Sequence, residues 1–175
     1  MKKISIEKLS KTIQVVALVI AALSGLISIV LWFLATVLSP EWIDASFPVV
    51  IETPIGLERS LLGSIPAMFP VIQFMLIFIT LSKLFKCYSR SIIFEAYNAQ
   101  LIKRVGLLLL ISPFVTLVSD IGLSFVLTYS QGLWEYSVSF TDSDITNFFI
   151  GVIVICISRV MRMAAIINEE NKLTI

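Results

Sequence analysis

The sequence has an apolar run from Thr12 to Leu38, 27 residues in all, that no charged side chain interrupts. A helix rises about 1.5 Å per residue, so about 20 apolar residues cross the roughly 30 Å hydrocarbon core of a bilayer. Three later stretches are also long and apolar enough: Ile65–Leu84, Val105–Leu127 and Ile145–Ala164. The pattern predicts an all-α membrane protein in which residues 1–175 form one domain, a bundle of four transmembrane helices.

Lipid, rather than water, is the solvent that the composition favours. Hydrophobic residues make up 58% of the chain and charged residues only 14%, whereas a soluble domain carries about 25% charged residues. The first apolar stretch is also longer than the roughly 7–15-residue core of a secretory signal peptide, so we expect a retained helix.

The basic residues indicate which side of the membrane each connecting segment occupies. Lys and Arg number four before the first span, one in the first loop, five in the middle loop, none in the last loop and three from Arg159 onward. Cytoplasmic segments carry the excess of bases. Both termini are therefore predicted to lie in the cytoplasm (N-in, C-in), with the chain in the inner membrane of a bacterium. Trp42 and Trp134 fall just beyond the outer ends of the first and third spans, where aromatic rings settle among headgroups.

Three prolines bear on the shape of the spans. Pro66 and Pro70 fall where the second span opens, and a helix start tolerates proline because the missing N–H would be unpaired there. Pro113 falls in the first half of the third span, where we expect a kink.

The two outer loops carry features of extended structure. In the last loop, residues 134–140 alternate between apolar and polar side chains, a period of two that is typical of a half-buried strand. The first loop, Ser39–Ser64, is longer than a plain helix connector. Because an isolated strand lacks a partner for its backbone, we expect the two loops to pair into a small β-structured cap on the extracytoplasmic side. The functional alternative is a cap that binds a ligand.

The inner loop reads as amphipathic. Phe94, Tyr97, Leu101 and Val105 recur near helical spacing between charged and polar residues, which predicts a short helix lying at the inner membrane surface before the third span begins. Its bases would be attracted to anionic lipid. Anchoring is the ordinary use of such a segment, and docking of a cytoplasmic partner is the alternative. The tail that follows Asn168 is expected to continue the last helix into the cytoplasm.

Small residues in the first span favour close helix contact. Ala21, Ser24, Gly25 and Ser28 lie near the spacing that lets two helix backbones approach. The helix that packs there could belong to the same chain or to a second copy, so a homo-oligomer stays open.

The third span carries the only acid within the four apolar stretches, Asp120. It belongs to a polar stripe whose members lie at i, i+4, i+7, i+8 and i+12 of one helix: Ser112, Thr116, Ser119, Asp120 and Ser124. Such side chains commonly hydrogen-bond to other helices. The alternative is that the stripe lines a solvated path for an ion or a small solute. We do not expect a direct ion pair of Asp120 with Arg159, because the two positions differ in depth.

Motifs for catalysis are missing from the sequence. There is no histidine, which removes the commonest general base and the commonest metal ligand. Cys87 and Cys156 are too few and too far apart to indicate a metal site or a disulfide framework. No motif of the zinc proteases, serine hydrolases or phosphate-binding loops occurs. We therefore predict that the protein is not an enzyme, holds no cofactor and does not bind nucleic acid directly.

From the second span onward the sequence resembles a known family. The features that carry the resemblance are the aromatic-basic start of the inner loop at Phe85, Ile93-Phe94, Asn98, Arg104-Val105-Gly106, Gly151 and the closing segment Glu169–Ile175. They are similar to those of the small four-span membrane proteins grouped as domain of unknown function 2975, an uncharacterised prokaryotic family whose members typically end in an acidic pair and Leu-Thr-Ile or Leu-Thr-Val.

Two positions depart from that family's pattern. The family usually has a glycine where this chain has Ser91, and it tends to carry an acid near the inner end of the last helix, where this chain has Arg159. A role that needs a carboxylate at that second position is therefore not carried over. The resemblance implies the topology rather than a mechanism. It also implies a small helix-turn-helix regulator as a partner, because members are often encoded beside one.

Our functional hypothesis is a non-enzymatic, regulatory or partner-binding protein of the inner membrane that acts through its cytoplasmic loop and C-terminal tail. The residues expected to contact a partner are Phe94, Tyr97, Lys103, Arg104, Glu169, Glu170, Leu173 and Ile175. The expected partners are membrane lipid, a small cytoplasmic helix-turn-helix regulator or another membrane protein. The alternative is a component of a small-solute or ion transporter that uses the polar stripe, and a third option is an accessory subunit without activity of its own.

Overall fold

The computed structural model describes residues 6–40, 42, 47–49, 51, 54–129 and 141–173, and every regular element in these ranges is helical. Helix α1 (Ile6–Phe33) runs on through a π-helical turn, η1 (Leu34–Leu38). The all-helical fold predicted from the apolar stretches is confirmed, and the helices are longer than those stretches because their ends continue into polar sequence.

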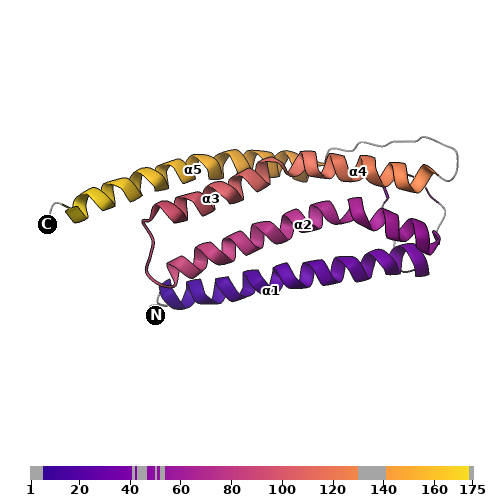
Figure 1. Cartoon of the computed structure of the whole chain (residues 1–175), viewed down its shortest axis with the longest axis horizontal. Coiled ribbons are helices and arrows are strands. Elements are labelled where there is room, and N and C mark those ends of the chain that lie inside the picture. The colour runs from indigo at the N-terminus through magenta and orange to yellow at the C-terminus, as the bar shows by residue number, and fades with distance from the viewer. Residues whose placement is uncertain are drawn as a thin grey trace.

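The remaining helices are α2 (Leu57–Tyr88), α3 (Ala96–Leu110), α4 (Ser112–Thr128) and α5 (Asp142–Leu173). In the described part of the chain, three helices are long and apolar enough to cross a membrane, and the number rises to four when α3 and α4, bent by 42°, count as one span. The bend lies at Ile111, with Pro113 in the first turn of α4, so the expected kink is confirmed. The first and last described residues lie at the same end of the molecule (Figure 1), as an even number of crossings requires.

The spans pack as an open row. Helix α1 packs on α2, α2 on α3 and α4, and α3 on α5, whereas α1 contacts neither α4 nor α5 within the described ranges. Figure 1 shows α1 and α5 on opposite sides of this row. Large apolar side chains of both helices are exposed, among them Leu26 on α1 and Phe149 on α5. These faces are suited to lipid, because lipid tails are as apolar as the side chains that they cover.

Glycine lets α3 and α5 approach each other. A Cβ atom at Gly151 would lie 2.6 Å from the backbone nitrogen of Leu110 and 2.8 Å from the carbonyl oxygen of Gly106. At Gly106 it would lie 3.0 Å from the carbonyl oxygen of Gly151. Because backbone atoms cannot move aside as a side chain can, this pair of glycines sets the distance between the two helices.

The end of the molecule opposite the termini is closed by buried polar contacts between α1 and α2. The Trp32 indole N–H donates to the Ser60 carbonyl at 2.9 Å, and the Thr36 and Ser60 hydroxyls lie 2.6 Å apart. Thr36 and Ser60 are both fully buried. The Ile55 N–H also donates to the Thr36 carbonyl at 2.9 Å, which ties the first loop to the π-helical turn.

The described part of the first loop packs inward instead of pairing as a strand. Val49 and Ile55 are buried against Leu123 and Leu127 of α4, and the ring of Phe47 meets the partly buried Trp32 edge-on at 6.2 Å. No strand occurs in the ranges that the structure covers, so the β-structured cap is not shown. The alternating segment 134–140 lies outside the described residues.

Two predictions about helix boundaries are wrong. Helix α2 begins at Leu57, so Pro66 and Pro70 lie inside it rather than at its start. The segment after Phe94 is not a separate surface helix, because α3 continues without a break to Leu110. Its inner face is covered by protein instead of headgroups, since Leu101 is almost fully buried.

The inner loop between α2 and α3 turns at Ser91, whose φ of 59° lies in the left-handed region. An L-residue with a Cβ pays about 1–2 kcal/mol for that conformation, whereas glycine adopts it freely. The left-handed turn is thus a position that favours glycine, as the family resemblance implied. Asn98 holds the turn from inside, because its amide donates to the carbonyls of Ile92 at 2.8 Å and Ile93 at 2.9 Å.

We predict that Gly151→Ala destabilises the protein by roughly 1–3 kcal/mol, the usual cost of forcing an extra methyl group into a packed interface. The added Cβ would meet backbone at 2.6 Å, so α3 and α5 must separate. Unfolding in mixed micelles of mild detergent and dodecyl sulfate, followed by circular dichroism, measures the change.

Gly56→Ala is the matched control, since a Cβ there meets nothing within 4 Å. Its free energy of unfolding should fall by less than about 1 kcal/mol, because Gly56 is the N-cap of α2 but makes no side-chain hydrogen bond there. Equal stability of both variants would show that α3 and α5 do not need the glycine contact.

Candidate functional site

The polar stripe of the third span forms contacts to two neighbouring helices. Ser119, 3% exposed, donates its hydroxyl hydrogen bond to the Pro66 carbonyl of α2 at 2.9 Å. In an α-helix the carbonyl of residue 66 would accept from the N–H of residue 70, but Pro70 has none. Ser119 therefore supplies the donor that the second proline removes.

Close packing accompanies this hydrogen bond. A Cβ at Gly122 would lie 2.9 Å from Cβ of Pro66, so the absence of a side chain at Gly122 lets the proline ring press against α4. Pro66 itself is buried. At the α2–α4 contact, Ser119 thus donates to the Pro66 carbonyl and Gly122 makes room for the Pro66 ring, both within about one turn of α4.

Gln73 also supplies a donor to a backbone carbonyl that lacks one within its own helix. Its side-chain amide donates to the Leu108 carbonyl, near the end of α3 and just before the bend. The last four carbonyls of a helix lack partners within that helix, and hydrocarbon offers no water to satisfy them. Gln73 is 7% exposed. This contact was not predicted from the sequence, although a lone glutamine in an apolar span is a signal for it.

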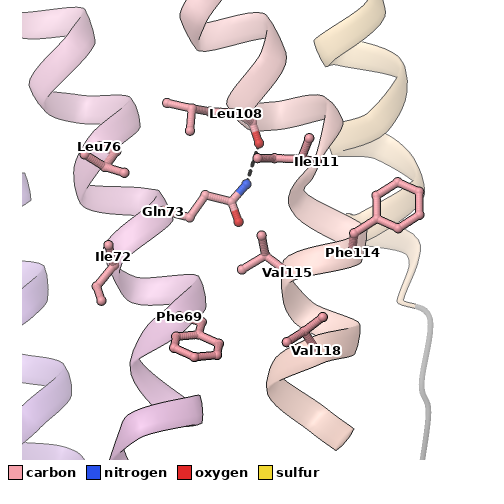
Figure 2. A pocket seen from close by; sticks show the side chains of 9 residues that line it. All are labelled: Phe69, Ile72, Gln73, Leu76, Leu108, Ile111, Phe114, Val115 and Val118. Atoms are coloured by element: carbon pink, nitrogen blue, oxygen red, sulfur yellow. Dashed lines mark hydrogen bonds between the residues drawn. The ribbon is translucent and has the colours of Figure 1, made fainter. Parts of the chain in front are cut away.

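An apolar groove of about 480 Å³ lies beside Gln73, between α2 and the bent α3–α4 pair. Figure 2 shows the glutamine pointing across this groove among the side chains that line it: Phe69, Ile72, Leu76, Leu108, Ile111, Phe114, Val115 and Val118. None of the five stripe residues is among these lining residues. The groove offers a hydrocarbon surface and no row of polar groups that an ion or a polar solute could follow.

The other hydroxyl contact of the stripe reaches α5. Thr116 donates to the Asp144 carboxylate at 3.2 Å, and Asp144 also accepts from the N–H of Thr141 at 3.0 Å and from its hydroxyl at 2.7 Å. Thr141 and Asp144 have the spacing of a capping box, which satisfies free N–H groups at a helix start. That spacing, threonine followed three residues later by an acid before an apolar run, could have been found in the sequence.

The remaining members of the stripe also lie among packed helices. The Ser112 carbonyl accepts from the Thr116 hydroxyl at 3.2 Å, and the carbonyl of the fully buried Ser124 accepts from the Thr128 hydroxyl at 2.8 Å. Asp120 is half-buried. Two members of the stripe thus bond different neighbours, Ser119 on α2 and Thr116 on α5.

The residues expected to contact a partner gather at the end where both termini lie (Figure 1). Phe94 and Tyr97 are each 48% exposed. The Asn168 amide donates to the Phe94 carbonyl at 3.3 Å, which joins the inner loop to α5. Four further candidates are exposed: Lys103, Arg104, Glu169 and Glu170. Leu173 ends α5, and Ile175 lies outside the described residues.

Eight basic side chains are exposed in the parts of the four spans that approach this end. We call them the basic belt: Lys8 and Lys11 of α1, Lys83 and Lys86 of α2, Lys103 and Arg104 of α3, and Arg159 and Arg162 of α5. Beyond the belt, α5 continues past the ends of the other helices (Figure 1). Between the belt and Asn168, α5 carries exposed apolar side chains, with Met163 63% and Ile167 58% exposed.

Metal chemistry has no ready site in the ranges described, because no three His, Cys, Asp or Glu side chains gather there. Both cysteines are free thiols.

One family model matches the chain, over residues 44–175, and its description is "Protein of unknown function (DUF2975)". The match includes the inner loop, α3, α4 and α5, which carry the features that suggested this family from the sequence. Neither the curated proteins nor the solved structures contain a match to the chain.

We predict that Ser119→Ala costs about 0.6 kcal/mol of stability, and at most about 1.7, the range for hydrogen bonds between transmembrane helices. The physical reason is the Pro66 carbonyl, which loses its donor. In a Pro70→Ala background the N–H of residue 70 can serve that carbonyl, so the same serine substitution should cost less.

A double-mutant cycle of Ser119→Ala and Pro70→Ala, measured by unfolding in mixed micelles, isolates this coupling. Thr80→Ala is the control, because the Thr80 hydroxyl donates only within its own helix, to the Leu76 carbonyl at 2.7 Å. If the costs of the two substitutions add, Ser119 does not replace the donor that Pro70 lacks.

Proposed function

This chain belongs to the DUF2975 family of proteins of unknown function, and on that premise we propose that it is a non-enzymatic protein of the bacterial inner membrane that binds a regulatory partner. The partner surface consists of the inner loop and the part of α5 beyond the basic belt. It faces the cytoplasm.

The observation that carries this proposal is the junction of Asn168 with Phe94. Their hydrogen bond of 3.3 Å links residues that are 74 positions apart. It joins two segments that each hold exposed apolar side chains, Tyr97 on one and Ile167 on the other. Exposed apolar groups outside the lipid-facing part of a helix are suited to a protein partner.

The chemistry of the surface indicates the kind of partner. Glu169 is exposed beside Asn168 on α5, so the apolar patch has an acidic edge. A partner with an apolar face bordered by Lys or Arg would complement it. A small helix-turn-helix regulator, which the family resemblance implied, is one candidate, and the basic juxtamembrane segment of another membrane protein is the second.

The basic belt supports a cytoplasmic location for this end. Two bases from each span lie there, and bases accumulate on the cytoplasmic side of inner-membrane proteins. The transporter alternative has weaker support, because Thr116 and Ser119 use their hydroxyls to bond α5 and α2. A transport path along the stripe would have to break these helix contacts.

We predict that both termini lie in the cytoplasm. In a background with Cys87→Ser and Cys156→Ser, a membrane-impermeant maleimide should label Ser143→Cys in intact cells. It should label Asn171→Cys only after permeabilisation. Both positions are exposed and lie on opposite ends of α5, so they differ only in the side that they sample. The reverse labelling pattern would contradict the N-in, C-in topology.

We predict that removing the exposed rings by Phe94→Ala with Tyr97→Ala weakens partner capture about tenfold or more, as truncation of an aromatic interface residue commonly does. A chain that ends at Asn168 should lose the same partner. The measurement is quantitative mass spectrometry of proteins that co-purify with the tagged, full-length protein after cross-linking in cells.

Trp42→Ala is the matched control, since it also removes an exposed ring, 75% exposed, but at the opposite end of the molecule. It should leave the captured partner unchanged. If the Phe94/Tyr97 variant, the truncated chain and wild type all capture the same proteins, the partner surface is not the docking site.

A further inference from the structure

We propose that a groove between α3 and α5 binds the headgroup phosphate of an anionic phospholipid from the leaflet on the side of the termini. The groove has a volume of about 560 Å³. Its lining combines three cations, two uncharged polar side chains and four apolar ones: Lys103, Arg159, Arg162, Gln100, Ser158, Ala99, Ile155, Met163 and Ile166. This inference does not depend on the proposed partner surface.

Small residues form the floor of this groove. Ala99 is 3% exposed and Ser158 is 4% exposed. The Ser158 hydroxyl donates to the Ile155 carbonyl of its own helix at 2.6 Å. The Gly106–Gly151 contact on one side of the groove and the Asn168–Phe94 hydrogen bond on the other hold α5 against α3 and its loop.

Three long cationic side chains rise from the walls. Lys103 comes from α3, and Arg159 and Arg162 come from α5; all three are exposed rather than folded into the protein. No carboxylate is among the residues that line the groove. Guanidinium groups bind phosphate oxygens in a bidentate way, and an ammonium group adds a point charge. The charges therefore favour a dianionic or monoanionic phosphate group.

The position of the groove favours a lipid over a soluble anion. Its cations belong to the basic belt, which marks the headgroup level of the membrane. Toward the membrane centre, Leu107 lies one turn past Lys103 on the same face of α3, and Val152 lies two turns before Arg159 on the same face of α5. Both are exposed apolar side chains, 42% and 39% respectively, along which an acyl chain can lie. Basic hollows between transmembrane helices on the cytoplasmic side are known to hold anionic lipid headgroups.

A second basic hollow, between α1 and α2, provides the contrast. It measures about 460 Å³, and each residue that lines it has a polar or charged side chain: Glu7, Lys8, Lys11, Gln14, Lys86, Ser89 and Arg90. These residues include a carboxylate, and no aliphatic or aromatic residue lines this hollow. Removal of its bases changes the net charge of the same end of the molecule without touching the α3–α5 groove.

Native mass spectrometry of the full-length protein, titrated with dioleoyl phosphatidylglycerol in detergent, tests the proposal. Each Lys or Arg near an anionic lipid contributes about fivefold in affinity, so Lys103→Gln with Arg159→Gln and Arg162→Gln should weaken the tightest binding event on the order of a hundredfold. Lys8→Gln with Lys11→Gln and Lys86→Gln loses the same charge and should keep that event within about threefold of wild type.

A variant without a charge change completes the design. Gln100→Trp places a large ring in the groove from an exposed position and should displace the lipid while all cations remain. Circular dichroism and thermal unfolding establish that each variant is folded before lipid is added.

Two further probes distinguish the source of the phosphate. Dioleoyl phosphatidylcholine should bind at least tenfold more weakly than phosphatidylglycerol, and soluble glycerol phosphate should not displace the bound lipid at millimolar concentration. Equal loss in both triple variants would overturn the site, since only general charge would then matter. Displacement by glycerol phosphate, or equal binding of phosphatidylcholine, would overturn the choice of an anionic lipid.

Discussion

The packing of this protein depends on one constraint: a backbone carbonyl inside hydrocarbon must find a donor within the protein. Pro70 leaves the Pro66 carbonyl without its helical partner, and the Ser119 hydroxyl of α4 supplies the donor. The end of α3 leaves another carbonyl, at Leu108, which the Gln73 amide of α2 satisfies. Both hydrogen bonds join α2 to the bent pair α3–α4. The third span is therefore held against the second by hydrogen bonds as well as by surface contact.

The second organising contact is steric. Gly106 and Gly151 bring α3 and α5 to backbone contact, while α1 packs only on α2 among the long helices described. The resulting open row leaves α1 and α5 broad faces for lipid and carries α5 beyond the other helices on the side of the termini. The partner surface and the cationic groove that we propose both follow from this arrangement, because each uses residues of α3 or its loop together with residues of α5.

Different parts of the structure could be read from the sequence to different degrees. The apolar stretches and Pro113 predicted the helices and the bend, because span length and proline chemistry act locally. The spacing of Thr141 and Asp144 also indicates a capping box, but this cap was not predicted from the sequence. Pro66 and Pro70 were predicted at the start of the second span, but α2 begins eight residues before the apolar stretch, at Leu57, where Ser60 bonds Trp32 and Thr36. The residues of the polar stripe were predicted to share one helix face. The sequence did not predict that Thr116 bonds α5 and Ser119 bonds α2.

The sequence by itself determined that the chain is helical, that its helices suit a membrane, that the third span bends and that bases gather near the termini. Each of these depends on side chains a few residues apart on one helix. The tertiary structure decided which hydroxyl donates to which carbonyl. It also decided that Lys103, Arg159 and Arg162 line one groove and that Asn168 donates a hydrogen bond to Phe94. Ser119 and Pro66 are 53 positions apart, and hydropathy carries no information about which faces of two apolar helices meet, because lipid is as apolar as either face.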